Sequence, residues 1–455
     1  MLNNRINRRD LLKYSFTAGL GGMTGENFVT DIQAGISEEK TKGLPRLRIM
    51  DVQVFHTNIL GMNYIPVKII TNEPGLYGVG DASLYGRDHA VIKCLDEYFK
   101  PMIIGRDPDR IEDIWQNIFR SGYWRGGPVQ MSALSGIDMA LWDIKGKRAG
   151  MPVYSLLGGK CREGLLIYTP MGGRDLNELE DNIRKKMEDG VKVFRVHPPQ
   201  KGSQSPYLNE IRNLYTDLSP EQKSEIPDTV IWDEDEYLKA VPKTFEYLNA
   251  KFDKEIKFCL DVHERISLNN AMQIAKILEP YNMFFVEDLL RPEHKESFRL
   301  IRNHTTAPLA MGELFNTKWD FLPLIIEQLI DYIRMDLAHS GGITEARKVA
   351  SIAEPFYIKT AWHGPAGYDL TPITMAANIH VDFAISNFGI QEYIFYNTSI
   401  DELFPNSIKY KNGYLEIGDE PGLGCDINET LIKKHPPKKV ILNTIRKPDG
   451  SIQDY

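Results

Sequence analysis

Three short stretches of this chain share one pattern, an apolar run that ends in a carboxylate. KFCLDVHER (residues 257–265) contains Asp261, MFFVEDLL (283–290) contains Glu287, and PLAMGELF (308–315) contains Glu313. The three acids follow one another at intervals of 26 residues, about the length of one strand, one helix and their loops in a barrel of parallel strands. Because the carboxyl ends of such strands meet at one mouth, we expect these three side chains to converge there.

The converging acids predict a metal site. One such acid alone is typical of a solvated loop or a helix cap, but three in phase, each after an apolar run, indicate a shared role. Carboxylate oxygens are the ligands of hard divalent cations, and Mg²⁺ in particular keeps water or substrate oxygens in its remaining positions. The pattern therefore predicts one Mg²⁺ per subunit, held by Asp261, Glu287 and Glu313.

Composition excludes several other classes of protein. The 455 residues exceed a single small domain, and a barrel of about 250 residues leaves room for a second one. The net charge is -8 and no long Lys/Arg run is present, which argues against a nucleic-acid partner. No stretch approaches a membrane-spanning length. The four cysteines are scattered, without the spacing of a zinc site or a disulfide framework.

The first 45 residues are set apart from the fold. Residues 7–13 read NRRDLLK and precede a mildly apolar, glycine-rich run, YSFTAGLGGM. This resembles a twin-arginine export signal, which addresses proteins exported already folded. We therefore expect residues 1–45 to be a signal and linker, and the protein to be periplasmic; without export it would be cytoplasmic.

The rest of the chain divides into three parts. Residues 46–164 read as strands followed by helices, an α+β domain. Residues 165–403 alternate short apolar runs with helical segments, which predicts an α/β barrel. Its expected strands are 165–169, 191–197, 256–263, 283–288, 308–313, 331–337, 357–363 and one near NFGIQE. The interval from Pro198 to about Glu234 reads as a long loop without regular structure, and we expect it to cover the site. Residues 404–455 are polar and turn-rich, and we expect them to pack back on the first domain.

Longer motifs carry a resemblance to a known family. SGIDMALWDIKGKRAGMPVYSLLGG (135–159), DLAHSGGIT (336–344) and the three spaced acids resemble the enolase superfamily. Within its mandelate racemase/muconate lactonizing enzyme family, LEPYNMFFVED, NFGIQEY and NGYLEIGDEPGLGCDINE are similar to the mannonate dehydratase group, including proteins once called starvation-sensing. The resemblance implies a modified TIM barrel, (β/α)7β, with an N-terminal capping domain. It also implies a homo-oligomer, a tetramer or an octamer, that acts on a sugar acid.

The resemblance assigns chemistry to particular residues. Asp261, Glu287 and Glu313 would hold Mg²⁺, which binds the substrate carboxylate, as superfamily sites do. His263 lies two residues beyond Asp261, so on a strand both side chains would face the barrel interior, where His263 could protonate a departing hydroxyl.

Two pairs compete for the role of the base. Asp336 and His363 resemble the base dyad of mandelate racemase and galactonate dehydratase, although the mannonate group generally lacks this Asp. Arg195 and Tyr207 match the pair assigned in mannonate dehydratases, with Tyr215 as a competitor for the tyrosine. We favour His363 with Asp336, because an adjacent carboxylate orients an imidazole and raises its pKa.

The substrate-binding set differs from that of the mannonate group. Tyr85 stands where the group has an Asn, and Pro170 stands where it has a His. The expected contacts are Tyr85, Arg334, His339, Asp369 and Glu392. Because sites built on hydrogen bonds discriminate steeply, the mannonate specificity does not carry over.

Three functions remain open from the sequence. The first is a dehydratase that converts a sugar acid of the mannonate, gluconate or galactonate type to a 2-keto-3-deoxy acid. The second is a racemase or epimerase that uses the same enolate. The third is a binding or regulatory protein with little turnover.

Overall fold

The structure, a computed structural model, describes residues 46–59, 61–199, 229–364, 370–395, 399–439 and 444–454. The expected signal with Arg8 and Arg9, the tyrosines Tyr207 and Tyr215, and Asp369 all lie outside the described residues.

The first part of the chain forms an antiparallel sheet with helices. Strands β1 (Ile49–Val54), β4 (Pro66–Thr71) and β5 (Tyr77–Asp81) pair in the order β1-β4-β5, and β2 (Thr57–Ile59) pairs with β3 (Met62–Tyr64). The helices that follow are α3 (Asp88–Lys93), which continues through a π-helical turn η1 (Cys94–Phe99) into α4 (Lys100–Ile103), then α5 (Ile111–Ser121), α6 (Pro128–Ala149) and α7 (Val153–Leu156). In α5 the buried residues recur at helical spacing, which explains why this segment forms an amphipathic helix: they are Ile111, Ile114, Trp115, Ile118 and Phe119.

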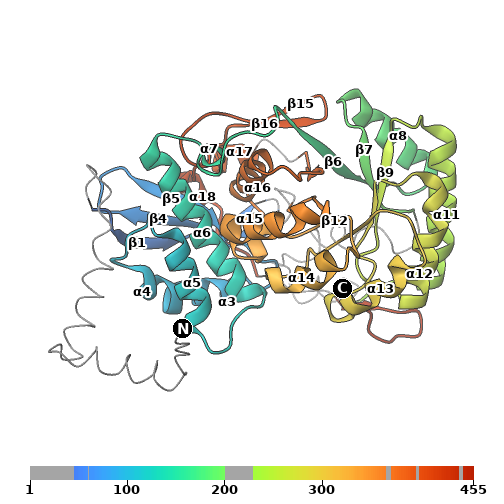
Figure 1. Ribbon diagram of the computed structural model, residues 1–455, viewed down its shortest axis with the longest axis horizontal. Helices are drawn as coiled ribbons and strands as arrows, with labels where there is room; N and C mark the ends of the chain where they lie inside the picture. Colours follow the sequence, from blue (N-terminus) through green and yellow to red (C-terminus); the bar gives the residue numbers. More distant parts are fainter. Residues whose placement is uncertain are drawn as a thin grey trace, which may run out of the picture. The chain divides into compact units, whose positions relative to one another are not determined.

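Glycines let the long helix α6 lie directly on β5 (Figure 1). A Cβ on Gly78 would lie 2.0 Å from the carbonyl oxygen of Ala140, and one on Gly80 would lie 1.9 Å from that of Gly136. Only residues without a side chain permit this approach. The contact places α6 where its other face reaches the second part of the chain through helix α15 (Gly342–Ala353).

Eight parallel strands of the described chain form the barrel. In chain order they are β6 (Leu165–Met171), β7 (Val193–Val196), β9 (Lys257–Asp261), β10 (Phe285–Glu287), β11 (Leu309–Met311), β12 (Tyr332–Ile333), β13 (Lys359–Thr360) and β14 (Gln391–Glu392). Each neighbour pairs in parallel up to β13, and β14 pairs with β6. A parallel bridge between Thr360 and Phe388, with a 2.9 Å hydrogen bond from Gly389 N to Thr360 O, closes the ring. The predicted (β/α)7β barrel is confirmed.

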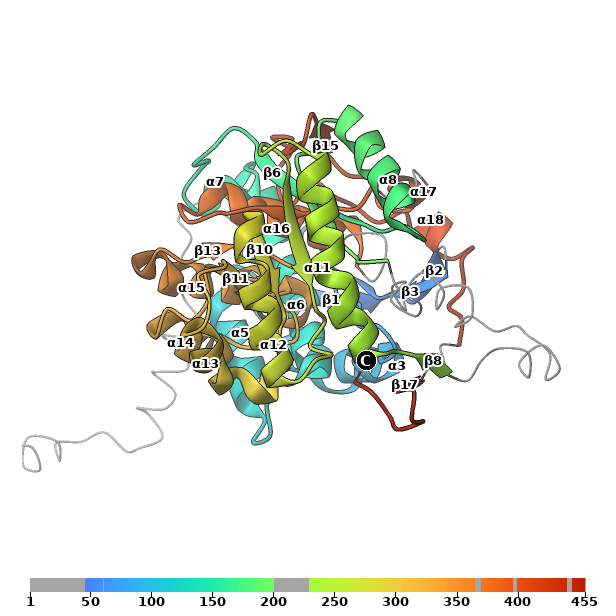
Figure 2. The ribbon, with the colours of Figure 1, turned by 90° about the vertical axis from the view of Figure 1, so that its right-hand side faces the viewer.

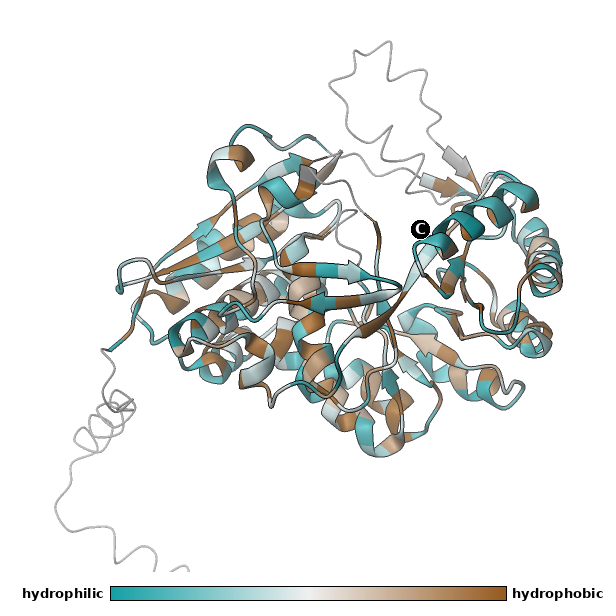
Figure 3. Ribbon diagram, turned by 90° about the horizontal axis from the view of Figure 1, so that it is seen from above, coloured by the Kyte–Doolittle hydropathy of each residue, from teal (hydrophilic) through white to brown (hydrophobic). Residues whose placement is uncertain are grey.

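Helices connect the strands and lie outside them, as Figure 2 shows for α8, α11 and α12. The connections are α8 (Leu176–Glu188), α11 (Glu234–Lys251), α12 (Leu268–Ile277) with η2 (Glu279–Tyr281), η3 (Pro292–Ser297) with α13 (Phe298–Arg302), α14 (Lys318–Ile326), η4 (Leu337–His339) with α15 and η5 (Glu354–Phe356), and α16 (Pro372–Ala384). Several begin at a side chain that accepts backbone N–H bonds, for example Asp175 before α8 and Asp233 before α11. Hydrophilic and hydrophobic residues both occur on the helices of the chain (Figure 3), and in α8 and α12 the buried residues recur at helical spacing, as in amphipathic helices.

The segment predicted to lack regular structure contains a strand at its end. β8 (Thr229–Ile231) pairs in parallel with β17 (Thr444–Arg446), near the other end of the sequence. The prediction of an irregular interval up to Glu234 is therefore wrong over these residues. A strand of three residues whose partner lies more than 200 positions away in sequence leaves little local signal.

The last part of the chain contacts both domains. It contains α17 (Ser399–Leu403), β15 (Ile408–Lys411), β16 (Tyr414–Ile417), α18 (Glu429–Ile432) and β17. β16 pairs antiparallel with barrel strand β6. On the capping domain, the Lys68 ammonium lies 2.6 Å from Glu429, and the Tyr77 hydroxyl donates a 2.5 Å hydrogen bond to Asp426. Within the described ranges, no helix is long and apolar enough to cross a membrane.

Candidate active site

The three predicted metal-binding acids lie at neighbouring strand ends. Asp261 is the last residue of β9 and Glu287 is the last of β10, and the two face each other in the strand register. Glu313 follows β11 by two residues. All are buried or nearly so, and the parallel barrel brings them together as the 26-residue spacing predicted.

Ligand atoms of Asp261, His263 and Glu313 lie within 4.8 Å of one another, close enough to share one metal ion. Glu287 is held differently. One of its oxygens lies 2.8 Å from Arg334 Nε, and the other lies 3.2 Å from Arg195 Nη1. Two predicted ligands thus meet with His263, and the third stands beside them in an ion-pair network.

The donor set fits a divalent cation. Besides the three predicted acids, Glu264 and Asp288 are buried at the same place. Burial, together with the neighbouring carboxylates, raises the pKa of Glu264, Asp288 and Glu287 well above the ordinary carboxyl value. The Asp288 Oδ2 atom accepts no hydrogen bond from the described residues. Buried carboxylates that lie this close together repel one another, and a small ion of high positive charge would relieve that repulsion. Oxygen ligands favour Mg²⁺ for this role.

His263 reaches the site by a different route from the predicted one. The strand β9 ends at Asp261, and His263 has a φ of 52°, in the left-handed region. The argument from strand alternation is therefore wrong for His263. Its backbone N–H instead donates a 2.9 Å bond to Asp261 Oδ1, and its Nε2 lies 2.7 Å from Asp261 Oδ2. A turn that folds back on the aspartate places the imidazole beside the acids.

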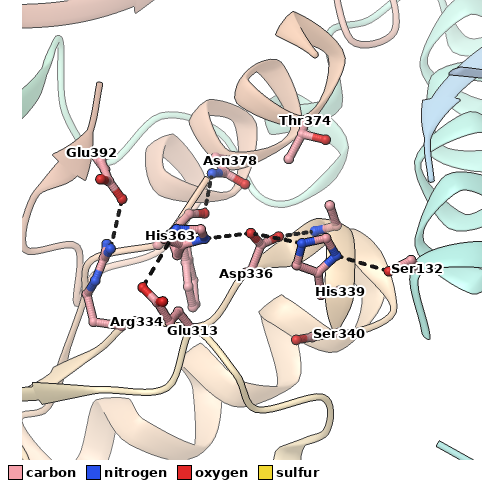
Figure 4. Close-up of polar contacts among 12 residues, drawn as sticks. Ser132, Glu313, Arg334, Asp336, His339, Ser340, His363, Thr374, Asn378 and Glu392 are labelled. Carbon is pink, nitrogen blue, oxygen red and sulfur yellow. Dashed lines mark hydrogen bonds and ion pairs between the residues drawn. The ribbon is translucent and has the colours of Figure 1, made fainter. Parts of the chain in front are cut away.

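His363 and Asp336 form the predicted pair (Figure 4). The Nδ1 atom of His363 lies 2.7 Å from Asp336 Oδ2, and its Nε2 atom faces Glu313 at 3.7 Å. Burial lowers the pKa of the His363 imidazole, but the charge of Glu313 and the hydrogen bond to Asp336 outweigh burial and raise it to about 10. A cation bound at Glu313 would offset part of that charge and lower the pKa toward neutrality.

His339 joins this pair to the capping domain. Its Nε2 atom lies 3.7 Å from the same Asp336 oxygen, and its Nδ1 atom lies 3.0 Å from the hydroxyl of Ser132 on α6. Asp336 therefore has an imidazole on each side (Figure 4). This position suits a positioning role for His339 through Asp336, and its direct substrate contact stays a prediction.

The two arginines and Glu392 form a second buried network. Glu392 lies 2.8 Å from Arg195 Nη1 and 2.8 Å from Arg334 Nη2. Burial disfavours the charge on Glu392, but these guanidinium groups outweigh it and lower the pKa to about 2. Burial likewise opposes the charge on Arg195, yet Glu392, Asp261 and Glu287 raise its pKa well above the ordinary value. Arg195 therefore stays charged and cannot itself take a proton.

The remaining predicted substrate contacts are placed as follows. Arg334 is fully buried, and donates to the Ala361 carbonyl as well as pairing with the acids. Tyr85 lies half-buried in the loop between β5 and α3, against the large hydrophobic core. Pro170 lies within β6. Arg334 and Glu392 thus face other protein groups, which favours support of the site over direct substrate contact.

Three residues of the site were missed in the sequence. Glu264 and Asp288 directly follow His263 and Glu287, and His197 lies two residues after Arg195, with its ring 6.2 Å from that of His263. Burial, with the charges of Arg195 and His263, lowers the pKa of His197 to about 3, so its imidazole is neutral. The two-residue spacing in VFRVH, which places Arg195 and His197 on one side of a strand, was the available signal.

Comparisons with known proteins agree with this geometry. Residues 45–158 match the mandelate racemase / muconate lactonizing enzyme N-terminal domain, and residues 180–431 match the enolase C-terminal domain-like family. A D-galactonate dehydratase family member from Musicola paradisiaca is 44% identical, over 90% of this chain and 99% of its own. A D-mannonate dehydratase from Caulobacter sp. (strain K31) is 43% identical, over 90% of this chain and 100% of its own.

A solved structure shares the fold. The enolase from Pantoea ananatis with bound D-gluconate and Mg superposes with a TM-score of 0.81 at 42% identity, covering 90% of this chain and 99% of that chain. A putative dehydratase from Salmonella gives a TM-score of 0.74 at 28% identity, over 86% of this chain and 98% of the other. Both domains, the barrel and the acids at its mouth place this chain in the mandelate racemase / muconate lactonizing enzyme family of the enolase superfamily.

Proposed function

We propose that this chain is a Mg²⁺-dependent sugar-acid dehydratase, a hydro-lyase acting on acids of the mannonate, gluconate or galactonate type. The observation that carries the proposal is the meeting of two imidazoles at one group of acids: His363, paired with Asp336, and His263, paired with Asp261. The names of the relatives and the D-gluconate and Mg in the Pantoea structure support the substrate class.

Asp261 and Glu313 would hold the metal, with Glu287 as the third acid. An Mg²⁺ ion held by these residues would withdraw electron density from the substrate carboxylate and so make the C2 proton more acidic. Glu287 is paired with Arg334 in this structure. It would therefore have to bind the metal while keeping this ion pair, or give the ion pair up.

His363 is the proposed base for the C2 proton. Its Nδ1 atom is held by Asp336, which leaves Nε2 on the side of Glu313, where the substrate carboxylate would be bound. The carboxylate of Asp336 fixes the ring orientation and stabilises the imidazolium that forms when the proton arrives.

His263 is the proposed acid for the C3 hydroxyl. When the C2–H bond breaks, its electron pair forms the C2–C3 double bond and the C3–O bond breaks. His263 gives its proton to the leaving hydroxyl, which departs as water. The enol product then converts to the 2-keto-3-deoxy acid. His363 takes one proton from the substrate at Nε2, and His263 gives one proton to the leaving hydroxyl. The substrate therefore loses one water molecule in total.

A screen of sugar acids with Mg²⁺ tests the proposal. Semicarbazide detects a keto product, and solvent deuterium reports exchange at C2. Keto product that disappears in Glu313→Gln supports the dehydratase. Exchange at C2 without keto product would make the chain a racemase or epimerase, and ligand binding with neither would make it a binding protein.

The chain's organisation is part of the proposal. We propose a capping domain over residues 46–164, a barrel over 165–403 and a C-terminal segment over 404–455, supported by the start of β6 at Leu165 and the end of α17 at Leu403. A homo-oligomer, tetramer or octamer, is the proposed assembly, which light scattering tests.

Periplasmic location through a twin-arginine signal is also proposed, on the NRRDLLK motif. Replacing Arg8 and Arg9 with Lys should retain the protein in the cytoplasm, as measured by fractionation. A native protein that stays cytoplasmic and uncleaved would refute the export reading.

A further inference from the structure

The capping domain contains a second group of possible metal ligands, far from the barrel acids in the sequence. His56 follows β1, and Asp88 and His89 begin α3. Ligand atoms of these three residues lie within 4.8 Å of one another. None of the residues assigned to the dehydratase reaction belongs to this group.

The two imidazoles face the same carboxylate. His56 Nε2 lies 2.7 Å from Asp88 Oδ2, and the rings of His56 and His89 stand edge to face with centroids 5.1 Å apart. Ligand atoms on a tetrahedral zinc ion lie roughly 3.3 Å apart, given metal–nitrogen distances of about 2.0–2.1 Å. A small rotation that lengthens the His56–Asp88 contact would therefore open a position for the ion.

The aspartate is held in place and charged. Asn63 donates a 2.8 Å hydrogen bond to the same oxygen of Asp88, and Asn63 is itself fixed by the amide of Asn58 and the backbone of Lys438. Burial raises the pKa of Asp88, but the hydrogen bonds from His56 and Asn63 outweigh burial and lower it. Such a second contact to the ligating carboxylate is the usual support of a metal site.

The histidines differ in exposure. His56 is half-buried, whereas His89 is exposed and its side chain makes no hydrogen bond to any residue that the structure describes. The site is thus closed on the side of Asp88 and open on the side of His89, where water could complete the coordination. Two imidazoles and one carboxylate suit zinc or a similar transition-metal ion rather than Mg²⁺ or Ca²⁺, which prefer oxygen ligands throughout.

We propose that His56, Asp88 and His89 form a binding site for a zinc-type transition-metal dication, separate from the Mg²⁺ site at the barrel mouth. An ion there would tie the end of β1 to the start of α3, three residues after Tyr85. The site would therefore stabilise the capping domain next to the loop that precedes α3.

Zinc and cobalt titrations of the full chain, purified without a histidine tag, test the proposal. The protein used is Asp261→Asn/Glu313→Gln, which removes the barrel-mouth ligands, with excess Mg²⁺ present. We expect one Zn²⁺ per chain by calorimetry, visible Co²⁺ bands, and a higher melting temperature with Zn²⁺. Absence of zinc binding in this folded variant would overturn the proposal.

Ligand variants identify the residues. His56→Gln and His89→Gln should each weaken Zn²⁺ binding at least about tenfold, since losing even an outer partner of a ligand costs about 10- to 100-fold. His294→Gln, at an exposed histidine elsewhere, is the matched control and should bind as before. Equal binding in all three would overturn the site. If the double variant does not fold, the native chain is titrated instead, and it should bind two Zn²⁺ ions per chain. His56→Gln in the native background should then bind one, and binding of two would refute the site.

Discussion

Replacing His363 with Asn tests the assignment of the base directly. The imidazole has one nitrogen held 2.7 Å from Asp336, and the other directed at Glu313. Asn has no group that can take a proton at neutral pH, so the base is lost while a polar side chain remains. A positioned base contributes about 10²- to 10⁴-fold. We expect the exchange of the substrate C2 hydrogen with solvent deuterium, followed by NMR, to fall by that factor.

Asp336→Asn measures the contribution of the partner alone. The variant keeps the size of the side chain and removes its charge, so His363 loses a hydrogen bond to a charged group. Such bonds contribute about 1.5–3 kcal/mol, which corresponds to about 10- to 150-fold in rate. The loss of exchange should therefore be smaller than for His363→Asn.

Two further variants separate the alternatives. His263→Asn should block formation of the keto product but leave C2 exchange, because an acid acts on the leaving hydroxyl rather than on the first proton. If Tyr207 with Arg195 is the base, Tyr207→Phe abolishes exchange and His363→Asn retains much of it. Exchange at the native rate in His363→Asn would refute the assignment of His363.

Three other predictions concern the metal and the fold. Glu313→Gln, or excess EDTA, should lower Mg²⁺-dependent activity by at least about 10²-fold with the circular dichroism unchanged; full activity in either case would contradict the metal site. Gly80→Ala should destabilise the protein by about 1–3 kcal/mol in urea unfolding, because the new Cβ meets the Gly136 carbonyl on α6, whereas Gly164→Ala, whose Cβ would lie 3.4 Å from Tyr414, should be nearly neutral. Burial raises the pKa of Asp138 to about 7, so between about pH 4 and 7 the folded chain keeps a proton that the unfolded chain releases. The free energy of unfolding should therefore fall as the pH rises through this range. Asp138→Asn should make the free energy of unfolding less dependent on pH, and an unchanged dependence would exclude the effect.

The barrel was predictable because its signals are local and repeat. Each strand is a short apolar run, and each predicted range, including NFGIQE for the last, overlaps a strand that pairs in the ring. Asp261 and Glu287 are the last residues of their strands. Their equal spacing predicted a shared site, which neither residue alone could have indicated. The close approach of α6 to the glycines of β5 depends on a contact between two elements, which the sequence analysis did not predict.

The partners of the charged groups were not predictable in the same way. Glu287 could have faced the other acids alone, yet its oxygens lie on Arg334 and Arg195. Which of several buried ions meet depends on side-chain directions in three dimensions, and strand spacing does not determine them. The position of His263 was not predictable either. Its backbone adopts a left-handed conformation, and no glycine in the sequence marks the turn.

The arrangement of the buried charges explains how the site can hold its acids close together. Asp261, Glu287 and Glu392 would repel one another, but Arg195 contacts all three and Arg334 contacts two of them. These pairs sit at or near zero exposure, so loss of one guanidinium would leave uncompensated charge in a low-dielectric interior, which costs about 3–5 kcal/mol.

The pair formed by His363 and Asp336 is also supported by a contact that leads to the capping domain. Asp336 is contacted by His363 from the barrel and by His339, which in turn meets Ser132 on the capping helix α6. The orientation of the base therefore depends on contacts from both domains, whereas the ion pairs of Asp261 and Glu287 among the described residues come from the barrel. A change that loosens α6 should accordingly affect the first proton transfer more than it affects metal binding.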